Sequence, residues 1–225
     1  MKKLFNYLRE LESHNERPWY HAHKAEKAES DAAFYALVQE LIFRTSELEP
    51  DMLYRTPAEL IYRLPRDARV WKDKPPYNPS YRAHLSVGAR KMVPLGCFLC
   101  LQPGGRSFVS GGLYSPSFRE ATLMIREHIY YHPAEWTEIV AAPAFAENFE
   151  VLGEKLKNVP RDFPPETEHG EALKHKSWYV MKTLTDREVL SAGLSDRILE
   201  LYAAMKPFND FLNEALRDFK LPEYE

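Results

Sequence analysis

The sequence has few of the features that mark secreted, membrane-spanning or disulfide-bonded proteins. Its 225 residues include only two cysteines, which excludes a disulfide framework. The first residues, MKKLFNYLRELESHNE, lack an apolar run that ends in small residues, so we expect no secretory signal and a cytoplasmic location. No stretch approaches the roughly 20 apolar residues of a membrane helix, and we therefore expect no membrane partner.

Motifs of common nucleotide and hydrolase sites are also missing. The chain contains no G-x-x-x-x-G-K-[ST], no G-x-G-x-x-G and no G-x-S-x-G. Their absence argues against a P-loop enzyme, a dinucleotide enzyme and an α/β-hydrolase. The formal net charge of -3 does not indicate a protein that coats nucleic acid non-specifically.

The composition is that of a globular protein. Hydrophobic residues make up 44% of the chain and charged residues 28%, which is ordinary for a folded domain. Helical patterns lie near both ends of the chain and strand-like segments lie between them, an order that indicates the α+β class. We expect a single domain over residues 1–225, with an antiparallel β-sheet of about five strands flanked by helices.

Apolar spacing predicts the helices. A first helix should stop near His14, and a second should run over about 21–48. Ser117 and Glu120 form a capping-box pattern that predicts a helix after them. Pro207 is expected to kink or divide the last helix, because proline removes a helical hydrogen bond.

Short apolar segments predict the strands. Residues 93–101 and 107–113 surround a Pro-Gly-Gly turn signal and predict a β-hairpin. Residues 177–184 are rich in β-formers and predict a further strand. Within the hairpin, the pair Gly111 and Gly112 would allow a bulge or the close approach of a ligand.

The segment 61–77, IYRLPRDARVWKDKPPY, concentrates positive charge. Residues 61–91 hold eight Lys and Arg against two Asp and Glu, a net of +6, while the rest of the chain holds 22 against 31, a net of -9. Arginine stays protonated and presents a planar fork that matches carboxylate and phosphate. So many cations in one short segment indicate that it binds something anionic.

We therefore expect a pocket for a small ligand that bears phosphate or carboxylate. Its predicted binding residues are Arg63, Arg66, Arg69, Lys74 and Tyr77. Asp67 and Asp73 are expected to orient these cations, and Asp67, Tyr77 and His23 are the nearest groups that could carry a proton in catalysis.

Two alternatives stay open. The segment could bind a nucleic-acid backbone or an acidic protein partner through a broad, convex basic surface. It could instead be a purely structural ion-pair network. The pattern assigns no cofactor and no oligomeric state, and it does not decide whether the chain is an enzyme.

No metal site is expected. Cys97 and Cys100 are three residues apart in a predicted strand, so their side chains point to opposite faces, and no second cysteine pair exists for zinc. His128 and His132 have the i, i+4 spacing of a two-histidine clamp, but no glutamate directly follows the first histidine.

The basic segment also resembles a family signature. Arg63-x-x-Arg66-Asp67-x-Arg69 followed by Asp73-Lys74-x-x-Tyr77 is similar to the signature of a family of bacterial proteins called DUF2461. Further similar segments are His14-Asn15 with Trp19-Tyr20 and His23-Lys24, Gly112-Leu113-Tyr114 with Pro116 and Arg126, and Leu156-Lys157 with Pro160, Leu173-Lys174 and Lys176.

This sequence departs from the family pattern at a few positions. Val70 stands where phenylalanine is usual, Asp162 where glycine is usual, and Glu168-His169-Gly170 where the family has Asp-His-Pro. The resemblance covers nearly the whole chain and implies a single domain of shared architecture. It implies no activity, because the family has no established one.

Overall fold

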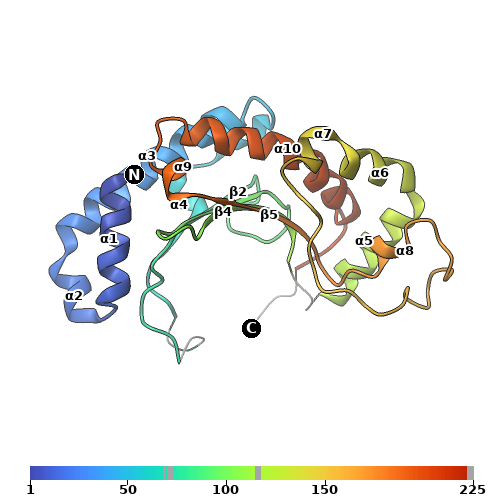
Figure 1. The fold of residues 1–225 in the computed structure, drawn as a ribbon, viewed down its shortest axis with the longest axis horizontal. Helices are drawn as coiled ribbons and strands as arrows, with labels where there is room; N and C mark the ends of the chain where they lie inside the picture. Colours follow the sequence, from blue (N-terminus) through green and yellow to red (C-terminus); the bar gives the residue numbers. More distant parts are fainter. Residues whose placement is uncertain (68, 70–72, 115–117, 222–225) are drawn as a thin grey trace. The chain divides into compact units, whose positions relative to one another are not determined.

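The computed structural model of the chain describes residues 1–67, 69, 73–114 and 118–221. Within these residues, five strands form one antiparallel sheet in the order β1–β2–β3–β4–β5 (Figure 1). The strands are β1 (Ile61–Tyr62), β2 (Tyr81–Leu85), β3 (Cys97–Leu101), β4 (Ser107–Leu113) and β5 (Trp178–Leu184). The sheet and the helices around it confirm the expected α+β class.

The chain divides into two compact units. The first comprises Met1–Arg90, Cys97–Val109 and Thr183–Glu200, and the second comprises Lys91–Gly96, Ser110–Lys182 and Leu201–Glu225. Strands β4 and β5 and the last helix, α10 (Leu194–Ala215), contribute residues to both units. A single domain over the whole chain stays a prediction.

The helices of the first unit pack on each other and on the sheet. They are α1 (Lys2–Ser13), α2 (Arg17–Ala22), α3 (Lys24–Thr45), a 3-10 helix (Pro50–Tyr54), α4 (Pro57–Leu60) and α9 (Asp186–Val189). Leu4, Leu8 and Leu11 of α1 are buried at helical spacing, as an amphipathic helix requires. The ring of Phe34 on α3 lies 5.1 Å from that of Tyr81 on β2, so α3 covers one face of the sheet.

The helix boundaries correct one prediction. Helix α1 stops at Ser13, with His14 as its cap, as predicted. The second predicted helix, over 21–48, corresponds to α3, but its first two residues belong to the separate helix α2. The backbone of His23 leaves helical geometry, with φ -102° and ψ 38°, and this separates α2 from α3.

The second unit is built around an aromatic cluster. Its further helices are α5 (Arg119–Tyr131), α6 (Pro133–Ala141), α7 (Pro143–Ala146) and α8 (Gly170–Leu173). The ring of Phe208 on α10 lies 5.9 Å from Trp136 on α6 and 5.5 Å from Phe145 on α7. Helix α10 continues through Pro207, so the proline does not divide it. Ser117, the predicted cap of α5, lies outside the described residues.

The glycine pair in β4 permits a close approach within the fold itself. Gly112 has φ +85°, and a Cβ there would lie 2.3 Å from the carbonyl oxygen of Trp178 and 2.8 Å from the Phe208 ring. A Cβ at Gly111 would also clash, at 2.7 Å from a methionine sulfur of α10. The chain that approaches these glycines therefore belongs to β5 and α10.

Among the described residues, no helix is both long and apolar enough to span a membrane.

We expect Gly112→Ala to destabilise the protein by about 3 kcal/mol or more. The new methyl group would combine a strained positive φ with overlap against the backbone of β5. Chemical denaturation measures the change. Gly193→Ala is the control, because a Cβ there has no neighbour closer than 4.0 Å. Equal stability of the two variants would contradict the close packing at β4.

The pH dependence of stability should report His175. This side chain is only 4% exposed, and burial together with the nearby Lys155 charge lowers its pKa from 6.5 to about 4. Below pH 6.5 the unfolded chain therefore binds a proton that the folded chain excludes, so the free energy of unfolding falls as pH falls toward 4.

We expect His175→Gln to reduce the loss of stability between pH 7.5 and pH 4.5. Urea unfolding at both pH values measures the difference. The exposed His132→Gln serves as control, and we expect it to keep the wild-type pH dependence. An unchanged pH dependence in His175→Gln would show that this histidine is not held neutral by the fold.

Candidate functional site

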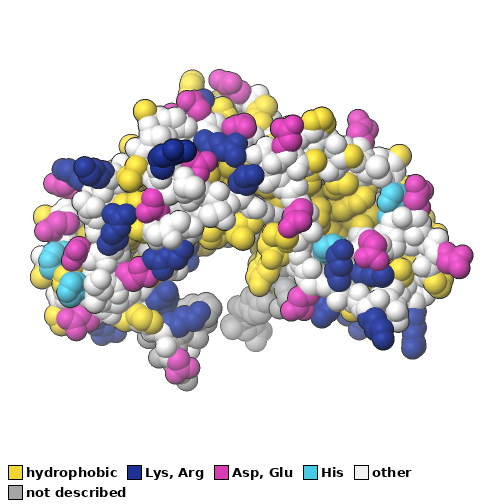
Figure 2. Space-filling model, viewed as in Figure 1, with side chains coloured by type: hydrophobic (Ala, Val, Ile, Leu, Met, Phe, Trp, Pro, Cys, Tyr) yellow, Lys and Arg dark blue, Asp and Glu magenta, His cyan; other side chains and the backbone are white. Residues whose placement is uncertain are grey.

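A cavity of about 520 Å³ lies beside the loop that joins β1 to β2 in the first unit. It is lined by Tyr62, Arg63, Pro65, Arg66, Asp67, Lys74, Asn78, Arg82 and Arg90. We call it the cation cavity, because five of these nine residues are Lys or Arg and one is acidic. Lys and Arg side chains gather on this loop at the lower left of Figure 2.

The loop is an irregular hairpin that extends beyond β1. The N–H of Arg66 donates to the carbonyl of Pro76 and the N–H of Asn78 donates to the carbonyl of Leu64, each at 2.8 Å. Regular strand structure ends at Tyr62. The prolines that follow in the loop have no backbone N–H to donate. The hairpin is thus held by a few specific bonds instead of a full ladder.

Two side chains fasten the hairpin at Tyr77. The guanidinium of Arg66 donates to the carbonyl oxygens of Pro75, at 2.7 Å, and Tyr77. The amide of Asn15 donates to the Tyr77 carbonyl and accepts from its N–H, both at 3.0 Å. The Tyr77 ring is 5% exposed and stacks on Tyr20 at 3.8 Å. Tyr77 therefore anchors the loop and does not line the cation cavity.

Two further arginines complete the cavity wall. Arg82 on β2 donates to the carbonyl of Arg63 at 2.9 Å, and its guanidinium lies 5.6 Å above the Tyr62 ring. Its Nε is buried and has no hydrogen-bond partner among the described residues. Arg90 donates to the carbonyls of Ala58 and Ile61 at 2.8 and 2.9 Å.

Carbonyl oxygens orient the guanidinium groups of Arg66, Arg82 and Arg90 without neutralising their charge. Among the described residues, no ion pair joins Arg63, Arg66, Arg82 or Arg90 to a carboxylate. Burial lowers the pKa of Arg66. Burial also lowers the pKa of Arg82, and repulsion from the Arg66 charge lowers it further. Both pKa values are lowered because burial removes the positive charge from water and no described carboxylate pairs with it.

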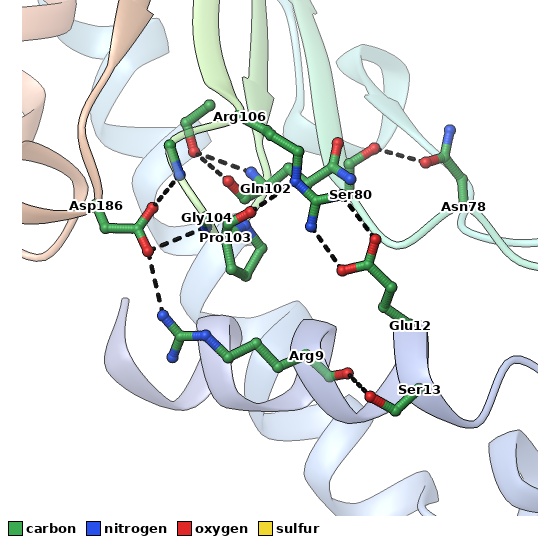
Figure 3. A network of polar contacts seen from close by, with 12 residues as sticks. Arg9, Glu12, Ser13, Asn78, Ser80, Gln102, Pro103, Gly104, Arg106 and Asp186 are labelled. Atoms are coloured by element: carbon green, nitrogen blue, oxygen red, sulfur yellow. Dashed lines mark hydrogen bonds and ion pairs between the residues drawn. The ribbon is translucent and has the colours of Figure 1, made fainter.

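The opposite arrangement occurs at the β3–β4 turn (Figure 3). There Arg106 forks onto the carboxylate of Glu12 at 2.7 and 2.6 Å. The carboxylate of Asp186 accepts from Arg9 at 3.2 Å and from the N–H groups of Gly104 and Gly105 at 3.0 and 2.9 Å. Burial acts to raise the pKa of Asp186, but these bonds hold it below its ordinary value. This network is structural, since each cation in it has an anionic partner.

Arg69 lies apart from the cation cavity. Its Nε and Nη2 donate to Asp67 at 3.1 and 2.8 Å, and its side chain is 90% exposed. These bonds lower the pKa of Asp67 to about 2, so Asp67 is a poor proton acceptor. Lys74 lines the cavity, whereas Asp73 is exposed and is not part of the lining.

His23 belongs to a different cavity. It stacks on Trp19 at 4.0 Å, and its Nδ1 lies 2.8 Å from the Trp19 carbonyl oxygen. The cavity that it lines measures about 300 Å³ and includes Tyr7, Glu10 and Glu26. The three proton-carrier candidates, Asp67, Tyr77 and His23, are therefore not brought together around one point.

The cysteines and the histidine pair show no metal-binding arrangement. Cys97 and Cys100 are free and buried, and burial raises the pKa of both thiols, that of Cys97 to about 12. The rings of His128 and His132 lie 4.4 Å apart. Within the described residues, no group of three or more His, Cys, Asp or Glu side chains is placed to hold a metal ion.

Two cations of the cavity were not predicted as ligands, Arg82 and Arg90. Both fall within the basic segment 61–91, but the charge count alone gave no reason to separate them from its other cations. The pairing of Tyr62 opposite Arg82 is the signal that would have found Arg82, and it depends on strand register.

The chain matches a protein-family model. A family model described as a conserved hypothetical protein (DUF2461) matches residues 3–211 of the chain, which include the whole basic segment. Searches of curated proteins and of solved structures found no match.

We expect Asn15→Ala to loosen the loop around the cation cavity. The variant would leave the N–H of Tyr77 without its partner and the Tyr77 carbonyl with Arg66 alone, at a cost of about 1–3 kcal/mol. Hydrogen exchange at the amides of Arg66 and Asn78 should become faster. Asn6→Ala is the control, because the Asn6 side chain accepts a long hydrogen bond, 3.4 Å, from an arginine of its own helix and does not bond to the hairpin among the described residues. Unchanged exchange in Asn15→Ala would mean that Arg66 alone holds the hairpin.

Proposed function

The chain belongs to the DUF2461 family, and from the geometry of the cation cavity we propose that it binds a small ligand bearing phosphate or carboxylate. The ligand contacts Arg63, Arg66, Lys74, Arg82 and Arg90. The expected setting is the cytoplasm of a bacterium.

The observation that supports this proposal most strongly is the set of four arginines that have no carboxylate partner among the described residues. Guanidinium groups close together repel one another, and a bound anion offsets that repulsion. Backbone carbonyls fix Arg66, Arg82 and Arg90 in place, so little order remains to be imposed when an anion binds. Planar N–H forks are suited to phosphate and carboxylate oxygens.

The size of the cavity favours a small ligand over a polymer. Its volume of about 520 Å³ is within the range of roughly 300–1,000 Å³ found for small-molecule sites. A surface for a nucleic-acid backbone or an acidic protein would spread its cations along a broad face. The structural ion-pair interpretation describes Arg69 with Asp67, but it does not account for the four cavity arginines, which form no ion pair with a described carboxylate.

We propose binding and assign no reaction to the site. Asp67 is the acidic group that lines the cavity, and its pKa of about 2 makes it a weak base at neutral pH. Tyr77 is occupied with loop packing, and His23 lines another cavity.

Calorimetric titration with pyrophosphate tests the proposal. We expect saturable binding that Arg63→Ala weakens about tenfold or more, because a charge-assisted hydrogen bond is worth about 1.5–3 kcal/mol. Arg63 is exposed, so this change should leave the melting temperature nearly unaltered. Arg187→Ala, which removes an exposed arginine from α9, is the charge-matched control and should bind like the wild type.

Two outcomes would count against the site. One is the absence of saturable binding of both pyrophosphate and organic carboxylates at low salt. The other is an equal loss of affinity in Arg63→Ala and Arg187→Ala, which would indicate a response to overall charge instead of a defined cavity.

A further inference from the structure

A row of aromatic side chains crosses the sheet next to the cation cavity. Tyr62 on β1, Phe98 on β3 and Phe108 on β4 form this aromatic row. The ring centroids of Tyr62 and Phe98 are 5.8 Å apart, and those of Phe98 and Phe108 are 6.1 Å apart. All three side chains are half-buried, so each retains ring surface that a ligand can contact.

Strand register places this row on the same face as the cavity arginine of β2. Tyr62 is opposite Arg82, and Phe98 is opposite His84, the next residue of β2 on that face. The alternate residues Ala83 and Leu99 point to the other face, where they are fully buried. The aromatic row therefore continues from the cavity wall, and Tyr62 belongs to both.

The two features together suit one kind of ligand. Cations around a cavity bind phosphate oxygens. The half-buried rings beside it, on the same face of the sheet, can stack on a planar aromatic group. Base–aromatic stacking is worth about tenfold or more in affinity per base. Inorganic phosphate, aliphatic organic acids and sugar phosphates have no aromatic ring that could stack on the row.

We propose that the cation cavity takes the phosphate of a nucleoside monophosphate or a similar aromatic phosphate ester, whose ring system lies on Tyr62 and Phe98. This assignment rests on the proposed function. That function requires the anionic end of a ligand, and the assignment names its organic part.

The distribution of charge supports a mononucleotide over a nucleic-acid strand. Proteins that bind single strands line the path of the backbone with cations. Here the cations surround one cavity at the Tyr62 end of the row. Arg106, the arginine nearest Phe108 in sequence, is forked onto Glu12. Arg106 therefore offers no uncompensated charge to a second phosphate at that end of the row.

The test compares two probes that share the same phosphate monoester, adenosine 5′-monophosphate and ribose 5-phosphate. Calorimetry of the wild-type protein should show about tenfold tighter binding of adenosine 5′-monophosphate. Phe98→Leu should remove most of this advantage and leave the affinity for ribose 5-phosphate within about twofold. Phe43→Leu, which truncates a more exposed aromatic ring on α3, is the matched control and should preserve the advantage.

Several results would overturn the assignment. Equal affinity of the wild-type protein for the two probes would show that the row does not contact the ligand. This comparison needs no variant. An equal loss of both probes in Phe98→Leu would mean that the ring supports only the fold. Tighter binding of a ten-residue oligothymidylate, with a steep dependence on salt, would assign the face to single-stranded nucleic acid. If pyrophosphate and ribose 5-phosphate both fail to bind, the proposed function itself is wrong.

Discussion

The candidate site depends on the hydrogen bonds that Arg66 and Asn15 give to the backbone around Tyr77. The described residues of the loop, 63–67, 69 and 73–80, contain no strand longer than a single bridge, and the prolines of the loop remove donors that a strand would use. One guanidinium and one amide supply the missing constraint. Because the Tyr77 ring is also stacked on Tyr20, the loop is fixed to the helices of the first unit, and the cavity beside it acquires a defined wall.

The same choice of partners sets the electrostatics of the cavity. A carbonyl oxygen orients a guanidinium group but leaves its full charge in place, whereas a carboxylate orients and neutralises it together. Arg66, Arg82 and Arg90 are held by carbonyls, and Arg9 and Arg106 are held by carboxylates. The molecule therefore contains both a structural network and a set of ordered cations with charge available to an anion.

The sequence and the structure agree on part of the site for reasons that individual residues make clear. Three of the predicted binding residues, Arg63, Arg66 and Lys74, line the cavity, since a short basic loop cannot spread its charges far apart. Arg69 does not, because Asp67 lies only two residues away and captures it locally. Tyr77 turns toward Tyr20 because a buried stacking partner is available there, which nothing in the basic segment reveals.

Composition and periodicity alone determined the α+β class, the helix over the first 13 residues, the β-hairpin and the concentration of positive charge, because each of these is a property of neighbouring residues. Strand register and packing between distant segments decided the rest. They set Tyr62 opposite Arg82, brought Asn15 to Tyr77, and placed Trp178 against Gly112. Contacts between residues far apart in sequence are fixed only when the whole chain buries its apolar faces, so the local pattern does not contain them.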